Sequence, residues 1–204
     1  MATAGEMIGV IANAIARPQA TVTSFYGALR KGGLISTTGR GRSAQHLSPL
    51  DVARILIVML SADSLQEGEA VTRLVGDLWH VRGGDDDPEP PQELQFEVAL
   101  SRLVAFLADV QHGRAARDDG FLGDLRSGEN GVRVTATHLT AEIIVGSQVT
   151  EFSSFEEPPP VSHPDDWEGL QVRDRLLLRA MMEGMSVTRG IDHTVLKLVA
   201  AAMP

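Results

Sequence analysis

The sequence predicts a mainly α-helical protein with a small β component. Through most of residues 1–81, and again in residues 92–112, apolar side chains recur every three or four positions, which is the spacing of one helix face. Residues 132–137 and 143–152 are instead rich in β-branched side chains, and we expect them to pair as antiparallel strands. The chain therefore combines several helices with one small sheet.

Local signals mark the first elements. Residues 7–15 carry one apolar helix face, which ends before Arg17-Pro18. Residues 22–29 repeat that spacing on a second helix, which the pair Gly32-Gly33 closes. The polar run 36–43 is rich in glycine, serine and threonine and suits a hairpin or an extended loop.

Further helices follow this loop. Ser48-Pro49-Leu50-Asp51 is typical of a helix start, with a serine cap, a proline at the first position and an acid three residues after the cap. Residues 52–59 then carry a buried apolar stripe, and residues 71–79, with Trp79 at the end, form another amphipathic helix. Residues 167–183 and 192–202 suit helices near the C-terminus.

The composition limits the classes of protein that the chain can represent. Of 204 residues, 43 % are hydrophobic and 22 % are charged, as in an ordinary globular protein. The absence of cysteine excludes disulfide frameworks, thiol nucleophiles, zinc fingers and iron–sulfur clusters. No apolar run reaches the roughly 20 residues that cross a bilayer, and the N-terminus lacks the features of a signal peptide. We therefore expect a cytoplasmic protein without a membrane partner.

The charge is distributed unevenly along the chain. Residues 1–50 contain five Lys or Arg and one acid, a formal charge of +4, whereas the other 154 residues carry −13. A basic N-terminal part on an acidic remainder is typical of a nucleic-acid-binding module attached to a module that does not bind nucleic acid. Chance clustering of charge is the alternative.

The order of the first elements resembles the winged helix-turn-helix of bacterial regulators. The segment from Ile11 to Val22 is similar to the family's alanine-rich positioning helix, tight turn and Thr-Val start of the recognition helix, and Leu29-Arg30-Lys31-Gly32-Gly33-Leu34-Ile35 is similar to its exit. Gly39-Arg40-Gly41-Arg42 and the segment from His46 to Val52 resemble the wing and the following helix of MerR-type regulators. The resemblance covers about 60 of the 204 residues, and the long dimerising coiled coil and effector cysteines of MerR proteins do not follow.

This resemblance implies which side chains face DNA. Val22, Phe25 and Leu29 would bury one face of a recognition helix at about 20–31, and a basic wing at 36–46 would carry arginines onto phosphates or into a minor groove. Tyr26 either flanks a phosphate or packs in the core. The candidate DNA-binding residues are Thr21, Thr23, Ser24, Tyr26, Arg30, Lys31, Arg40 and Arg42. The alternative is an ordinary three-helix core with a solvated loop.

Signals of catalysis or of metal binding are weak. The acidic run Asp85-Asp86-Asp87 lies in a proline-rich linker, where charges are usually solvated, and the six histidines are scattered without a pair at ligand spacing. Gly39-Arg40-Gly41-Arg42 lacks the lysine–serine ending of a phosphate loop, and no serine lies in the setting of a nucleophile elbow. We expect no enzyme activity, no catalytic residue, no metal site and no cofactor.

Three parts are expected along the chain. Residues 1–64 would form the winged helix-turn-helix domain, and residues 65–155 a region of helices and strands that assembles a homo-oligomer. Residues 156–204 would form a proline-rich connector and C-terminal helices. The oligomer prediction rests on the broad apolar faces that contain Trp79, Phe96 and Phe106.

These observations favour a protein that binds double-stranded DNA, with transcription regulation as its role. The alternative is a DNA-recognition and packaging subunit similar to the small terminase subunits of phages, which join a helix-turn-helix to oligomerising helices in a ring. That role would place the chain in a phage or another mobile element. A third possibility is an interaction scaffold whose helix-turn-helix no longer binds DNA.

Overall fold

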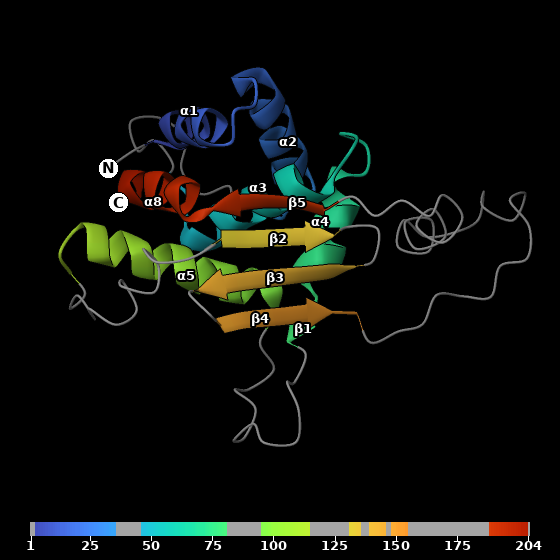
Figure 1. Ribbon diagram of the computed structural model, residues 1–204. Helices are drawn as coiled ribbons and strands as arrows, with labels where there is room; N and C mark the ends of the chain where they lie inside the picture. The colour runs from blue at the N-terminus through green and yellow to red at the C-terminus, as the bar shows by residue number, and fades with distance from the viewer. Residues whose placement is uncertain are drawn as a thin grey trace, which may run out of the picture.

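The computed structural model describes residues 3–35, 46–80, 95–114, 131–135, 139–145, 148–154 and 188–203. This part of the chain is mainly helical and contains a small antiparallel sheet, as the sequence predicts (Figure 1). Its elements, in chain order, are α1 (Ala4–Ala14), α2 (Gln19–Lys31), α3 (Pro49–Ser61), α4 (Gly68–Gly76), β1 (Trp79–His80), α5 (Phe96–Gln111), β2 (Gly131–Thr135), β3 (Thr140–Val145), β4 (Gln148–Ser153), β5 (Thr188–Asp192) and α8 (His193–Ala202).

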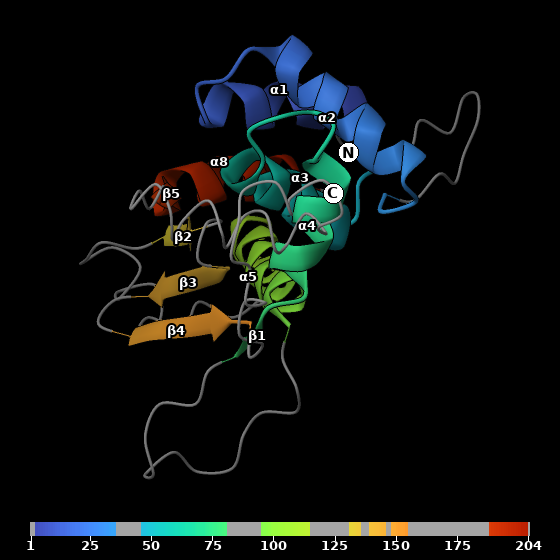
Figure 2. The ribbon, with the colours of Figure 1, turned by 90° about the vertical axis from the view of Figure 1, so that its right-hand side faces the viewer.

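The sheet and the helices form two layers. Five strands pair in the order β1-β4-β3-β2-β5, and every neighbouring pair is antiparallel. In Figure 2 the strands lie on one side, and α3, α4 and α5 lie beside one face of the sheet. α1 and α2 lie beyond the β5 end of the sheet, away from β1 and β4 (Figure 1).

Alternation along β2 and β3 explains which face of the sheet the helices cover. Val132 and Val134 are fully buried, and they are paired with Ile143 and Ala141 on β3. Arg133 lies between the two valines and is paired with Glu142, so this pair faces the opposite side of the sheet, with 3.9 Å between guanidinium and carboxylate.

The predicted strands are present, with one correction. The strand expected over 132–137 is observed as β2, but the single strand expected over 143–152 is wrong. Two strands, β3 and β4, occupy that region and pair with each other, with Val145 opposite Gln148. The β-branched run showed the strand propensity correctly, but the sequence Gly146-Ser147 between the strands is a turn signal that interrupts the run.

α3 is the central helix of the structure. From Asp51 to Ser61 every residue except Arg54 is buried, and α3 contacts α2, α4, α5, β2 and β5. Its start is the predicted one, because the Ser48 hydroxyl accepts from the Asp51 amide and the Asp51 carboxylate accepts from the Ser48 amide.

One hydrophobic core runs through all three of the expected parts, residues 1–64, 65–155 and 156–204. It includes Met7 from α1, Phe96 from α5, Val132 from β2 and Leu196 from α8, and α8 packs directly on both α1 and α5. The described helices and strands on either side of residues 64 and 155 therefore share their buried surface.

Three helix predictions have clear outcomes. The helices expected over 92–112 and 192–202 are observed as α5 and α8, and Asp192 caps α8 by accepting from the Val195 amide at 3.0 Å. The helix expected to include Trp79 is longer than the observed one, because α4 ends at Gly76. Trp79 belongs to β1 instead and pairs there with Ser153 of β4. The periodic pattern continued past Gly76, but the chain already leaves the helix there. The helix expected over 167–183 lies outside the described residues.

The apolar side chains on which the oligomer prediction rests are partly buried by other residues of the same chain. Phe96 is completely buried, and its ring centre lies 5.3 Å from that of Phe152 on β4. Trp79 and Phe106 are half-buried. Phe96 therefore gives no support to an oligomer, which stays a prediction.

The connection between α1 and α2 contains a strained residue. α1 ends in a Schellman motif, in which the Arg17 amide donates to the Ala12 carbonyl at 2.9 Å and Ala16 takes a left-handed conformation with φ of 51°. The corresponding residues after α2 and α5 are Gly33 and Gly113, with φ of 75° and 68°. Alanine thus occupies a position that glycine fills at the other two helix ends, at a cost of roughly 1 kcal/mol or more.

We expect Ala16→Gly to raise the free energy of unfolding by about 0.5–1 kcal/mol, because relief of this strain outweighs the added freedom of the unfolded chain. Urea denaturation measures the change. The matched control is Ala28→Gly inside α2, where glycine should lower stability by about 1 kcal/mol. A loss of stability in both variants would contradict the strained conformation of Ala16.

Candidate nucleic-acid interface

The inward face of α2 is the predicted one. Val22, Phe25 and Leu29 are buried, and they pack the helix against its neighbours α1, α3 and α4. The Phe25 ring lies so close to Gly68 of α4 that a Cβ atom at Gly68 would come within 3.0 Å of it. α1 and α2 cross steeply instead of lying side by side (Figure 1). The orientation of α2 is therefore fixed by its apolar stripe.

The outward face of α2 holds most of the candidate DNA-binding residues. Thr23, Ser24, Arg30 and Lys31 are exposed, whereas Thr21 and Tyr26 are half-buried. Gly27 is also exposed, and a Cβ atom there would meet no atom within 4 Å. From Gln19 to Lys31 the helix contains no acidic residue. This face therefore combines small side chains with positive charge.

The two hydroxyl groups on this face donate to their own helix. Thr23 Oγ1 donates to the Gln19 carbonyl at 2.8 Å, and Ser24 Oγ donates to the Ala20 carbonyl at 2.9 Å. Each hydroxyl oxygen keeps lone pairs that can accept a hydrogen bond from outside. In this arrangement, Thr23 and Ser24 present acceptors, which suit the amino groups of adenine or cytosine in a major groove.

A further arginine lies at the C-terminal end of α2. Arg73 of α4 donates from Nη2 to the Gly32 carbonyl at 2.9 Å and also pairs with Glu69 at 3.2 Å. Arg30 and Lys31 occupy the last turn of α2, where positive charge is favourable next to the exposed carbonyls. Sequence reasoning missed Arg73, because the i,i+4 spacing from Glu69 predicts the ion pair but not the contact with α2.

Arg54 fixes the chain just after α2. Its guanidinium donates from Nη1 to the Leu34 carbonyl at 2.6 Å and from Nε and Nη2 to the two carboxylate oxygens of Glu97, each at 2.8 Å. The hydrogen bonds to Glu97 raise the pKa of Arg54. Burial and the nearby Glu97 carboxylate raise the pKa of Asp77. Arg54 thus joins α3, α5 and the segment that leads toward the expected wing.

The expected wing at 36–46 lies almost entirely outside the described residues, including Arg40 and Arg42. Of the residues 36–46 the structure describes only His46, and it describes Ile35 directly before them. Arg40 and Arg42 therefore stay predictions.

We expect Arg54→Met to lower the free energy of unfolding by about 2–3 kcal/mol, because it leaves the Glu97 carboxylate without its partner in a site where the two side chains are only 20 % and 13 % exposed. The control is Arg102→Met on α5, an exposed cation whose removal should change stability by less than about 0.5 kcal/mol. Chemical denaturation of both variants measures the free energy of unfolding. A similarly small decrease in the two variants would contradict a stabilising role of Arg54.

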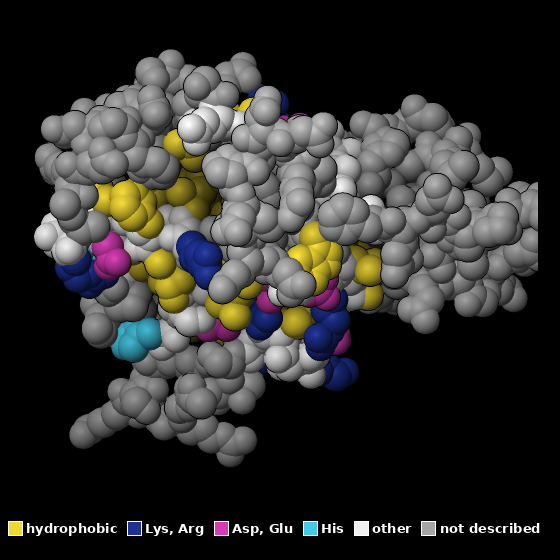
Figure 3. All heavy atoms as spheres, turned by 90° about the horizontal axis from the view of Figure 1, so that it is seen from below, with side chains coloured by type: hydrophobic (Ala, Val, Ile, Leu, Met, Phe, Trp, Pro, Cys, Tyr) yellow, Lys and Arg dark blue, Asp and Glu magenta, His cyan; other side chains and the backbone are white. Residues whose placement is uncertain are grey.

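Other parts of the described surface differ from α2 in their charges. Seen from below, at the β1–β4 end, cationic and anionic side chains lie interspersed among hydrophobic ones (Figure 3).

In the described ranges, no group of three or more His, Asp or Glu could hold a metal ion. No described helix has the length and apolar character that a bilayer span requires.

Comparisons of the chain with family models, with curated proteins and with solved structures find no match.

Proposed function

We propose that the protein binds double-stranded DNA through the outward face of α2 and acts in transcription regulation. One observation carries the proposal. In a chain with a net charge of −9, α2 exposes small polar side chains and two cations and contains no acid.

Small side chains allow a helix to approach the floor of a groove. The major groove admits an α-helix, and contacts with base edges need the backbone of that helix to come close. On the outward face of α2, Thr23, Ser24 and Gly27 leave about one helical turn without a long side chain. The hydroxyl groups of Thr23 and Ser24 in the same turn donate to their own helix, which leaves their oxygen lone pairs open to a donor on a base.

Cations at the end of the helix suit the phosphate backbone. Arg30 and Lys31 are exposed, and contacts from such residues position a protein on the duplex without reading sequence. Their binding releases counterions, so affinity must fall as salt increases. The crossed packing of α1 and α2 is in keeping with the helix-turn-helix resemblance of the sequence.

We expect the pair of substitutions Arg30→Ala and Lys31→Ala to reduce the slope of log affinity against log salt by about 1.8, since each lost phosphate contact removes roughly 0.9. The matched control removes two cations elsewhere, Arg102 on α5 and Lys197 on α8, and should leave the slope unchanged. Fluorescence anisotropy with a mixed-sequence duplex at several salt concentrations measures both. An unchanged slope in the α2 variant would contradict phosphate contacts by this helix.

A single position tests the helix face itself. Gly27→Glu adds a carboxylate in the middle of the face without a steric clash, and it should abolish DNA binding while the fold is kept. Gly27→Gln has nearly the same shape without the charge and should bind much more tightly than Gly27→Glu. Equal affinity of Gly27→Glu and the unmodified chain at low salt would overturn the proposal.

A further inference from the structure

A groove lies between the α1–α2 connection, α3 and β5, and we call it the β5 groove. Its volume is about 450 Å³. The lining comes from residues 14–17 at the end of α1 and in the connection, from residues 189–192 of β5, from Val195 of α8, and from Leu56, Met59 and Leu60 of α3. No residue of α2 lines it, so the groove is separate from the proposed DNA surface.

One wall of the groove is β5, the edge strand of the sheet in the part of the chain that the structure describes. β5 ends the strand order and pairs with β2 on one side. In an antiparallel pair, every second residue directs its N–H and C=O away from the partner strand. Within the described ranges, no hydrogen bond outside the β2 ladder reaches the main chain of Gly190 or Ile191. An open edge of this kind is a template for another strand.

The floor of the groove is apolar. Leu56, Met59 and Leu60 of α3 line the groove together with Ile15 and Val195. A strand added beside β5 would direct alternate side chains toward this floor. Four lining residues of β5 span about 13 Å, which matches about four residues of an extended peptide.

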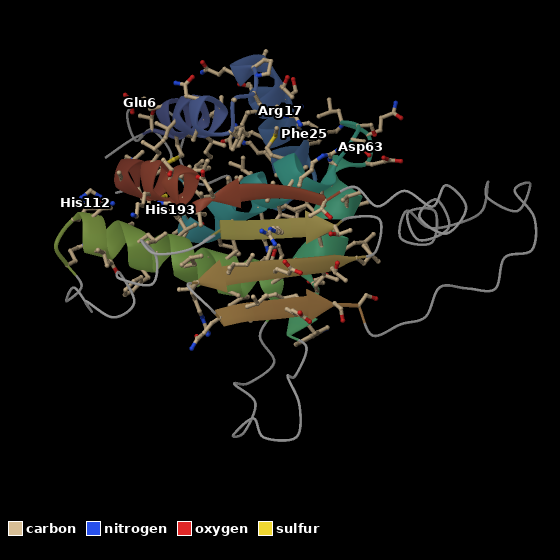
Figure 4. All side chains as sticks on the ribbon, in the orientation of Figure 1. Glu6, Arg17, Phe25, Asp63, His112 and His193 are labelled. Carbon is tan, nitrogen blue, oxygen red and sulfur yellow. The ribbon has the colours of Figure 1, made fainter. Side chains whose placement is uncertain are left out.

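One cation at the groove is available to a ligand. Arg189 is already engaged, because it pairs with Asp63 and donates to the Leu60 and Ala62 carbonyls at the end of α3. Asp192 is engaged as the cap of α8. Arg17 is exposed and has no ion pair with the part of the chain that the structure describes. Figure 4 places it beside the α1–α2 connection, above β5.

We propose that the β5 groove binds an extended peptide of a partner protein, which adds as a strand beside β5 and pairs a carboxylate with Arg17. Main-chain hydrogen bonds to the open edge supply affinity, and the apolar floor and Arg17 select side chains. The open edge favours a peptide over a small organic acid, since only a peptide repeats donors and acceptors at the spacing of a strand. This inference does not depend on DNA binding.

The probe is a fluorescein-labelled, acetylated heptapeptide of alternating glutamate and valine, titrated with the full chain by fluorescence anisotropy. We expect binding that weakens at least about tenfold when the alternate peptide nitrogens are methylated, because methylation removes the donors that a strand needs. Arg17→Glu should weaken binding by a similar factor, and the control Arg102→Glu should have no effect. Arg17 is exposed, so its substitution keeps the fold.

Several results would overturn the proposal. No binding of the probe at about 1 mM, or binding that methylation leaves unchanged, would rule out strand addition. Competition by pentanoate as effective as that by the unlabelled peptide would instead identify a site for small organic acids. Self-association that Arg17→Glu abolishes, without peptide binding, would identify a second copy of the chain as the occupant.

Discussion

Burial of α3 on almost all sides is the constraint on which the rest of the structure depends. Because residues 51–61 expose only Arg54 to a notable degree, the helix needs cover from α2, α4, α5 and the sheet together. α2 supplies its apolar stripe to the core and is left with a polar and basic outward face. Arg54 extends its guanidinium from α3 to Glu97 of α5 and to the Leu34 carbonyl. It thereby connects α5 to the segment that follows α2.

Features that depend on a few neighbouring residues could be predicted from the sequence. The Ser48 cap, the glycine exit of α2 and the inward face formed by Val22, Phe25 and Leu29 all act over less than ten residues, and each is observed. The contact between Arg54 and Glu97 joins residues 43 apart, and that between Arg73 and Gly32 joins residues 41 apart. β5 has five residues and is defined by its pairing with β2, so no local pattern revealed it or the groove beside it.

The connection between α1 and α2 links the two proposed binding surfaces, which are separate from each other. This connection sets the direction in which α2 leaves α1, and it also forms one wall of the β5 groove. Ala16 holds a left-handed conformation there, and Arg17 follows it directly. A peptide seated in the groove would therefore contact the residues that orient the proposed DNA-binding helix.

Protection of single thiols tests the central claim, that DNA lies on the outward face of α2, most directly. The chain contains no cysteine, so Ser24→Cys introduces one thiol on that face, and Val149→Cys introduces one at a side chain 51 % exposed on β4, at the far end of the sheet. We expect a saturating duplex at low salt to slow maleimide alkylation of the first variant at least about tenfold, because a helix seated in a groove is shielded from the reagent. Alkylation of the second variant should keep its rate. Equal alkylation rates with and without DNA in the first variant, under conditions where DNA is bound, would contradict it.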